Sequence, residues 1–369
     1  MALMNYVTRI QFGLGALQVL KDELIGAGIR RPMIVTDAGV TAAGLLERLL
    51  GQLDPGMPVF DATPENPTEA AARDALAMFR AEACDGLVAL GGGSPTDLAK
   101  AVAVLVVGDG SLEDLAFDRV GLNSFPKPLP PLVAVPTTAG TGSEVGGGSL
   151  VTFASGRKSL IAGHALVPRV AICDPELTLG LPPRLTAATG MDALSHCIET
   201  YLSPRDNPIA DAIAVEGLVR GFHALPRAVA NGQDRGARTD MMLAATMGAL
   251  AFQKGLGAVH ALSHPLGAKG HHHGTLNAIF LPHVLERNAR SAANKMAALE
   301  LRLGLTLGLA DALRALSSKV DLPAKLSELG VRDGELRDLA PLCLREAAHD
   351  TNPVRLTEDD YAALYRAAF

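Results

Sequence analysis

Short apolar runs alternate with longer amphipathic stretches in the first half of the chain. Three such runs, each followed by a turn signal, are Pro32–Thr36 (PMIVT), Gly86–Leu90 (GLVAL) and Leu132–Val135 (LVAV). Runs that are apolar at nearly every position are typical of strands buried on both faces of a parallel sheet. Helical spacing is found between the runs, over Ala42–Leu50, Thr68–Ala83 and Thr96–Val107. The alternation predicts an α/β domain with an open, mostly parallel sheet that binds ligands at the carboxyl ends of its strands.

From about Asp174 onward the strand signal ends and helical spacing takes over. The stretches with this spacing are rich in Ala and Leu and cover Leu185–Tyr201, Ala210–Ala224, Arg238–Lys254, Ala292–Leu303 and Leu309–Ser318. The connector Asp174–Pro183 (DPELTLGLPP) is interrupted by prolines and marks the boundary. We therefore expect an α/β domain over residues 1–175 followed by an all-helical domain over residues 176–369.

Composition narrows the range of functions. The 369 residues are enough for two domains, and 48% of them are hydrophobic. The net charge is −6 with no dense cluster of Lys or Arg, which argues against a nucleic-acid or membrane-surface partner. No apolar run approaches the roughly 18 residues that span a bilayer, and no secretory signal opens the chain. The four cysteines lie far apart without a CxxC pair, as is typical of reduced thiols. We expect a soluble cytoplasmic enzyme that acts on a small molecule.

A glycine-rich turn follows the strand expected at Gly86–Leu90. The turn Gly91–Gly93 leads into a predicted helix, with Ser94 as the expected N-cap. Pro95 then takes the first helical position, and Asp97 completes a capping box with Ser94. Backbone N–H groups at such a helix start suit a pyrophosphate, although triple glycines also form ordinary turns.

Two further features fit the same ligand. The loop Pro136–Glu144 (PTTAGTGSE) follows the strand Leu132–Val135, and its hydroxyls suit ribose or phosphate oxygens or the loop's own backbone. Asp37 follows the strand Pro32–Thr36, where a carboxylate accepts both hydroxyls of a ribose or caps a helix. The sequence leaves both alternatives open for each feature.

Aspartate and histidine recur at helical spacing in the second half. Asp192 and His196 lie four residues apart, as do His260 and His264, and a run of histidines covers 271–273. Residues four apart share one side of a helix, so Asp192 and His196 either meet one ion or form a surface pair. One Asp with two or three His suits Fe²⁺ or Zn²⁺.

Together these motifs resemble the iron-containing (group III) alcohol dehydrogenase family over essentially the whole chain. The segments that carry the resemblance are GGGSPTDLAK (Gly91–Lys100), PTTAGTGSEV (Pro136–Val145), DPELT (Asp174–Thr178), GMDALSHCIE (Gly190–Glu199) and the segment from HALSHPLG to HHHG (His260–Gly274). The resemblance implies an architecture shared with dehydroquinate synthase. In it, residues 1–175 form the NAD-binding α/β domain and residues 176–369 the all-helical, metal-binding domain.

The resemblance also implies site residues. Its metal ligands correspond to Asp192, His196, His260 and the histidine directly before a glycine, which is His273. The segment that ends there is one residue shorter than the family pattern, so His271 and His272 stay as alternatives. His264 matches the family's histidine near the nicotinamide and is the expected catalytic residue. The implied cofactor-binding residues are Asp37, Asn66, Gly92, Gly93, Ser94, Asp97, Thr137, Thr138, Thr141, Ser143 and Lys158.

The activity that the resemblance implies is reversible hydride transfer between an alcohol and NAD. A divalent metal, Fe²⁺ or Zn²⁺, polarises the alcohol oxygen, and His264 carries the proton outward. One alternative is a maleylacetate reductase-like enzyme, which needs cations for carboxylates; between His260 and His273 the sequence offers Lys269 alone. A dehydroquinate synthase-like lyase needs several Lys or Arg, and Asp192–His196 has none. A silent metal-binding scaffold is the third alternative. The resemblance suggests a homodimer or larger assembly, and the sequence does not identify the substrate.

Overall fold

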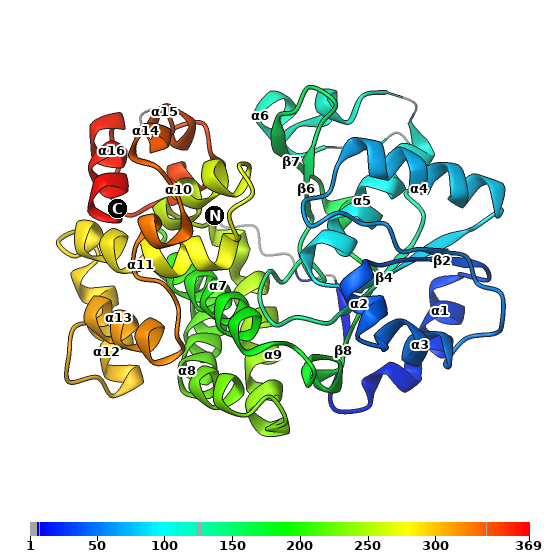
Figure 1. Cartoon of the computed structure of the whole chain (residues 1–369), viewed down its shortest axis with the longest axis horizontal. Helices are drawn as coiled ribbons and strands as arrows, with labels where there is room; N and C mark the ends of the chain where they lie inside the picture. Colours follow the sequence, from blue (N-terminus) through cyan, green and yellow to red (C-terminus); the bar gives the residue numbers. More distant parts are fainter. Residues whose placement is uncertain (1–5, 7, 109, 124, 126, 337) are drawn as a thin grey trace. The chain divides into compact units, whose positions relative to one another are not determined.

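The computed structural model describes residues 6, 8–108, 110–123, 125, 127–336 and 338–369, and its elements are labelled in Figure 1. The described chain falls into two compact units. One comprises Tyr6–Thr138 with Gly142–Gly180, and the other comprises Ala139–Thr141 with Leu181–Phe369. The main division thus lies after residue 180, where the sequence places it after residue 175. We call the two the α/β unit and the helical unit.

A six-stranded parallel sheet forms the centre of the α/β unit, with strand order β1-β8-β5-β4-β2-β3. Its strands are β1 (Arg9–Phe12), β2 (Pro32–Val35), β3 (Val59–Phe60), β4 (Gly86–Gly91), β5 (Leu132–Pro136) and β8 (Val170–Cys173). An antiparallel hairpin of β6 (Gly148–Thr152) and β7 (Lys158–Ala162) follows β5. The expected open, mostly parallel sheet is confirmed.

Helices complete this unit, and two hydrophobic cores form because neighbouring strand residues point to opposite faces of the sheet. The helices are α1 (Leu20–Ala27), α2 (Ala38–Ala42), α3 (Leu45–Leu50), α4 (Glu69–Ala81), α5 (Gly93–Val107) and α6 (Phe117–Val120). Met33 and Val35 of β2 share a core with Leu98 of α5. Ile34, between them, belongs to a second core with Leu24 of α1. Burial on both faces explains why the central strands are apolar throughout.

Two helix predictions need correction in detail. The helix expected over Ala42–Leu50 is split into α2 and α3, because Gly44 adopts a left-handed conformation with φ of 74° at the start of α3. The helix expected over Arg238–Lys254 is regular only as far as Leu250 and ends in a 3₁₀ turn over Ala251–Lys254.

The helical unit contains no strand among its described residues. Its helices are α7 (Pro183–Leu202), α8 (Pro208–Ala230), α9 (Arg235–Leu250), α10 (Ala258–Gly267), α11 (His273–Asn288), α12 (Ala293–Leu303), α13 (Leu309–Lys319), α14 (Asp333–Leu336), α15 (Ala340–Cys343) and α16 (Glu358–Ala367). Helix α7 is buried along most of its length and packs against α8, α9 and α11, while α10 packs against α11. The all-helical second half is confirmed.

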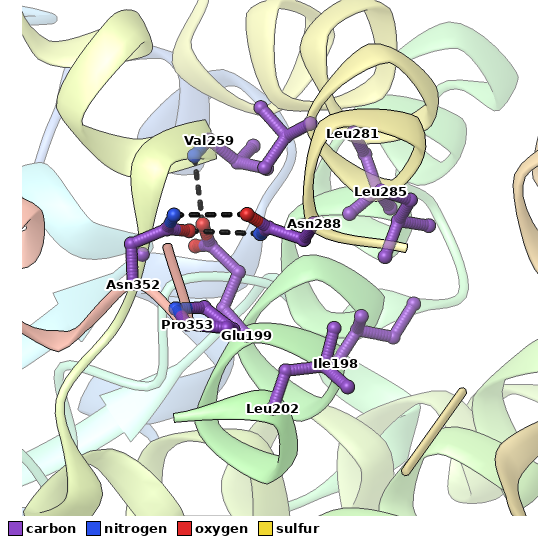
Figure 2. A pocket seen from close by; sticks show the side chains of 11 residues that line it. Ile198, Glu199, Leu202, Val259, Leu281, Leu285, Asn288, Asn352 and Pro353 are labelled. Carbon is purple, nitrogen blue, oxygen red and sulfur yellow. Dashed lines mark hydrogen bonds between the residues drawn. The ribbon is translucent and has the colours of Figure 1, made fainter. Parts of the chain in front are cut away.

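A small cavity lies inside the helical unit, beside a network of buried polar side chains (Figure 2). Its volume of about 10 Å³ is close to the lower limit for one water molecule. At its edge Asn288 and Asn352 exchange two amide hydrogen bonds of 2.9 and 3.0 Å, and Glu199 lies beside this pair. The network therefore links α7, α11 and the segment that contains Asn352.

No single described helix is both long and apolar enough to cross a bilayer. The segments Arg235–Lys254 and Ala258–Gly267 meet that criterion only as a pair, which is bent by 108°.

Candidate metal centre and dinucleotide loops

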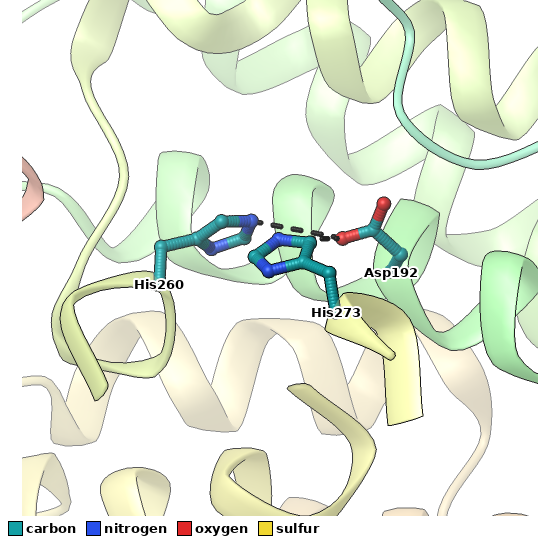
Figure 3. A group of neighbouring side chains, drawn as sticks. All are labelled: Asp192, His260 and His273. Atoms are coloured by element: carbon teal, nitrogen blue, oxygen red, sulfur yellow. Dashed lines mark ion pairs between the residues drawn. The ribbon is translucent and has the colours of Figure 1, made fainter. Parts of the chain in front are cut away.

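Three of the four predicted ligands of the helical unit lie around a carboxylate oxygen of the fourth, Oδ1 of Asp192 on α7. The Nε2 atom of His196, one turn further along α7, lies 3.3 Å from it. His260 of α10 and His273 of α11 place their Nε2 atoms 3.7 and 3.5 Å from the same oxygen. Figure 3 shows both rings directed at the carboxylate. Ligand atoms of Asp192, His260 and His273 all lie within 4.8 Å of one another, which is the spacing of a metal site.

The distance between α7 and α11 is set by Gly274, the residue after His273. A Cβ atom at Gly274 would lie 2.2 Å from the carbonyl oxygen of Ala188 and 3.3 Å from Cβ of Asp192. Any larger residue at this position would therefore force the two helices apart. The glycine of the HHHG segment brings His273 within reach of Asp192.

The carboxylate oxygen and imidazole nitrogens at this site are suitable ligands for a divalent cation. Asn277, one turn after His273, has its amide nitrogen 2.7 Å from Oδ1 of Asp192. The same nitrogen lies 3.3 Å from Nε2 of His260 and 3.2 Å from Nε2 of His273. An amide N–H group with its partial positive charge thus lies where acceptors from three helices meet. Imidazole nitrogen and carboxylate oxygen are the ligands that Fe²⁺ and Zn²⁺ accept.

The electrostatics of the site also favour positive charge. Burial raises the pKa of Asp192, but the charge of His196 and the hydrogen bond with His260 outweigh it and hold that pKa well below its usual range. Burial lowers the pKa of His260, but Glu199 and Asp192 outweigh it and raise that pKa to about 9. Burial lowers the pKa of His196 to about 4, so its imidazole is neutral at neutral pH. The ionised carboxylate of Asp192 and the neutral imidazole of His196 are the forms that bind metal, and His260 would release a proton when a metal ion binds.

Two of the histidines have a carboxylate within hydrogen-bonding distance of Nδ1. Nδ1 of His260 is hydrogen-bonded to Oε2 of Glu199, which lies on the same face of α7 as Asp192 and His196. Nδ1 of His264 lies 2.7 Å from Oε2 of Glu346. A carboxylate at Nδ1 fixes the orientation of an imidazole ring and leaves Nε2 for chemistry.

The other histidines of this region occupy distinct positions. The ring of His264 stacks on that of His273 with centroids 5.3 Å apart, and the side chains of His264 and Glu346 are 25% and 32% exposed. His272 caps α11 instead, because its Nδ1 faces the backbone N–H of Thr275. Of the three candidates in the run 271–273, His273 is the one whose ring lies at Asp192.

In the α/β unit, the glycine turn differs from its predicted capping. Helix α5 begins at Gly93, with Gly92 as N-cap, and among the described residues no side chain caps it. The expected capping box is wrong, because Ser94 lies inside the first turn and its hydroxyl donates to the carbonyl of Glu65 at 2.5 Å. The N–H groups at the start of this helix are thus free of side-chain caps, which suits an anionic ligand.

The two predicted cofactor loops lie next to each other at the carboxyl ends of β4 and β5. The N–H of Thr137 donates to the carbonyl of Gly91 at 3.0 Å. A Cβ atom at Gly92 would lie 3.1 Å from the hydroxyl oxygen of Thr138. Thr141 lies in the short segment Ala139–Thr141, which groups with the helical unit.

Asp97 and Ser143 hold the second loop in place. The hydroxyl of Ser143 donates to Oδ1 of Asp97 at 2.7 Å, and the N–H of Leu150 donates to Oδ2 at 3.0 Å. Nζ of buried Lys100 lies 2.8 Å from each of four oxygens, Oγ and the carbonyl oxygen of Ser143 and the carbonyl oxygens of Gly146 and Gly148. Asp97 and Ser143 therefore both have a structural role in this loop. Contact of either residue with the cofactor stays a prediction.

The remaining predicted cofactor residues have clear positions. Lys158, the first residue of β7, donates from Nζ to Oδ1 of Asn66 at 2.6 Å, so these two predicted residues meet. Asp37 is the N-cap of α2, and its Oδ1 accepts from the N–H of Val40 at 2.9 Å. The capping alternative for Asp37 is thus present in the structure, and ribose binding stays a prediction.

Sequence reasoning missed Glu199, Asn277, Glu346 and Asn352. Glu199 carried a usable signal, because residues 192, 196 and 199 share one face of a helix. Asn277 follows His273 by one helical turn, which is a weaker signal in the sequence. Glu346 lies 82 residues from His264, and no local pattern announces such a contact.

Both halves of the chain match known protein families. Residues 7–175 match the family model described as iron-containing alcohol dehydrogenase. Residues 186–369 match the model described as Fe-containing alcohol dehydrogenase family, C-terminal. The two models together cover most of the chain.

Three similar proteins illustrate the match. A 4-hydroxybutyrate dehydrogenase of Cupriavidus necator is 46% identical over 374 residues, covering 98% of each chain. The crystal structure of a 1,3-propanediol oxidoreductase superposes with a TM-score of 0.94 at 35% identity, covering 100% of both chains. A sulfoacetaldehyde reductase of Bifidobacterium kashiwanohense, solved in complex with NAD⁺, gives a TM-score of 0.91 at 31% identity, covering 100% of this chain and 98% of that one.

Proposed function

Because the chain belongs to the iron-containing alcohol dehydrogenase family and is an oxidoreductase of that family, we propose that it transfers hydride between a primary alcohol and NAD with one divalent metal ion. The observation that carries the proposal is the convergence of three imidazole Nε2 atoms, from His196, His260 and His273, on one oxygen of Asp192. We propose these four residues as the metal ligands and Fe²⁺ as the resident ion, with Zn²⁺ as the alternative.

The protein's own residues supply binding and proton transfer. When bound, the metal polarises the alcohol oxygen and the nicotinamide accepts the hydride. His264 is the proposed proton carrier: Glu346 holds its Nδ1, and the partial exposure of both side chains gives the proton access to solvent. The side chain of His273 is 33% exposed, so the metal site opens on this side.

The α/β unit holds the proposed NAD site. The start of α5 at Gly92 and Gly93 suits the pyrophosphate, because a helix N-terminus binds anions. The Asn66–Lys158 pair offers donors to ribose hydroxyls. The adjacent loop contributes Thr137 and Thr138. NAD itself is supported by the relative that was solved with NAD⁺.

The substrate proposed is a short primary alcohol, or its aldehyde, with a second polar group at the other end. The three similar proteins are named for 4-hydroxybutyrate, 1,3-propanediol and sulfoacetaldehyde. Each compound is a terminal alcohol or aldehyde with a carboxylate, hydroxyl or sulfonate at the far end. That shared chemistry supports the substrate class.

Anaerobic purification with metal analysis, followed by a substrate panel, tests the function. We expect one metal ion per chain, and NADH formation with 4-hydroxybutyrate or 1,3-propanediol. Maleylacetate and a dehydroquinate synthase substrate belong in the same panel, since their turnover would favour the alternative enzymes. Bound metal without any turnover of these compounds would favour a scaffold.

We expect NAD to be preferred over NADP by at least about tenfold in kcat/KM, which requires only ~1.4 kcal/mol. The carboxylate of Asp37 repels a 2′-phosphate, and Ala38, Gly39 and Val40 that follow it offer no cation. The variant Asp37→Gly should narrow the ratio chiefly by improving NADP. Thr68→Gly, which removes another N-cap of this unit, is the matched control and should leave the ratio unchanged. Equal kcat/KM with both cofactors in the unmodified enzyme would leave Asp37 as a helix cap alone.

We also propose a cytoplasmic homodimer. All four cysteines are free thiols, three of them buried, as suits a reducing compartment. The dimer rests on the family resemblance, and light scattering of the purified enzyme tests it.

A further inference from the structure

Helix α10, which carries His260 and His264, is capped by side chains from elsewhere in the helical unit. Its own N-cap is Gly257, which has no side chain to offer. The N–H of Ala258 donates instead to Oδ1 of Asn352 at 3.2 Å. The N–H of Val259 donates to Oε1 of Glu199 at 2.7 Å. The start of this helix is therefore fixed by α7 and by the segment that contains Asn352 (Figure 2).

The second carboxylate oxygen of Glu199 contacts His260, the residue after Val259. Oε2 is hydrogen-bonded to Nδ1 of His260, so one carboxylate binds both the helix start and the imidazole. Because a carboxylate accepts hydrogen bonds, it keeps the proton on Nδ1. Nε2, which lies 3.7 Å from Oδ1 of Asp192, is then the nitrogen that is left to bind a metal ion. Glu199 and His260 are 5% and 1% exposed, and such burial strengthens the interaction.

We propose that Glu199 is a positioning residue that selects the Nδ1–H tautomer of His260 and thereby sets the metal affinity of the site. The inference rests on the proposed metal centre. The proposal gives different roles to the two side chains that cap α10. Asn352 fixes the backbone only, whereas Glu199 fixes the backbone and the protonation pattern of a ligand.

The variant Glu199→Gln tests the role with little change in volume. An amide presents one acceptor and one donor, so it cannot accept from both the N–H of Val259 and Nδ1–H of His260. If the amide donates to Nδ1 of His260, the imidazole proton moves to Nε2 and blocks the metal. We expect Zn²⁺ affinity, measured on the metal-free protein by competition with a chromophoric chelator, to fall about 10- to 100-fold.

Two further variants serve as controls. Glu346→Gln makes the same chemical change at the carboxylate behind His264, which is not a proposed ligand, and should leave Zn²⁺ affinity unchanged. Asn352→Ala removes the other cap of α10 and should lower Tm with a smaller loss of Zn²⁺ affinity than Glu199→Gln. Wild-type affinity in Glu199→Gln, or an equal loss in Glu346→Gln, would overturn the proposal.

A spectroscopic measurement on the unmodified protein keeps the test independent of how the variants fold. In the Zn²⁺-loaded chain with ¹³C,¹⁵N-labelled histidine, we expect a strongly downfield proton on Nδ1 of His260, assigned by through-bond correlation to the backbone of that residue. A proton on Nε2 instead would overturn the inference.

If Glu199→Gln weakens Zn²⁺ binding but the wild-type enzyme oxidises no alcohol, only the proposed function fails. If alcohols are oxidised and Glu199→Gln binds Zn²⁺ normally, only this inference fails.

Discussion

Replacement of His260 by alanine is expected to abolish both bound metal and turnover while NAD still binds. The change removes one of four proposed ligands and leaves the buried carboxylate of Glu199 without its imidazole partner. Most of the proposed NAD-binding residues, among them Gly92, Gly93 and Lys158, belong to the α/β unit, so we expect cofactor binding to survive the loss of this ring. Metal content per chain, turnover and NAD titration measure the three expectations on one preparation.

Histidine variants outside the site are the controls for this experiment. His223→Ala changes an exposed histidine of α8 and should retain metal and turnover. Within the run 271–273, we expect His273→Ala to lose the metal and His271→Ala and His272→Ala to retain it. Normal metal content in His260→Ala would refute the ligand assignment.

The variant His264→Ala should lower kcat about 100-fold, at the low end for general acid–base groups, and leave the metal in place. The ring of His264 lies against His273 but presents Nδ1 to Glu346, outside the set that converges on Asp192. Metal analysis beside steady-state kinetics separates the two roles. Loss of metal from this variant would make His264 a ligand and exclude the proton-carrier role.

The central strands could be predicted because burial on both faces leaves a continuous apolar run, as in β2, β4 and β5. The strand β1 has the sequence RIQF, half of it polar, because it lies at the edge of the sheet. The strand β3 has only two residues, too few for any pattern. The strand β8 (VAIC) carries the same apolar signal, but it is not among the three strands predicted from the sequence.

The candidate site was predictable where its geometry is local. Asp192 and His196 share a helix face because they lie four residues apart, and spacing alone indicates this. The capping box expected at Ser94 was wrong because three glycines allowed the helix to begin earlier, at Gly93. The carboxylates behind His260 and His264 depend on tertiary packing, so spacing indicates Glu199 only in part and Glu346 not at all.

The close approach of α7 and α11 at Gly274 has a consequence for the energetics of folding. The four proposed ligands come from three helices, and they meet only when those helices are packed together. An ion held by all of them binds the native state and not the unfolded chain, so it shifts the folding equilibrium by mass action. At a free metal concentration of about 100 times Kd the gain is roughly 2.7 kcal/mol. Metal starvation would therefore lower the amount of folded enzyme as well as its activity.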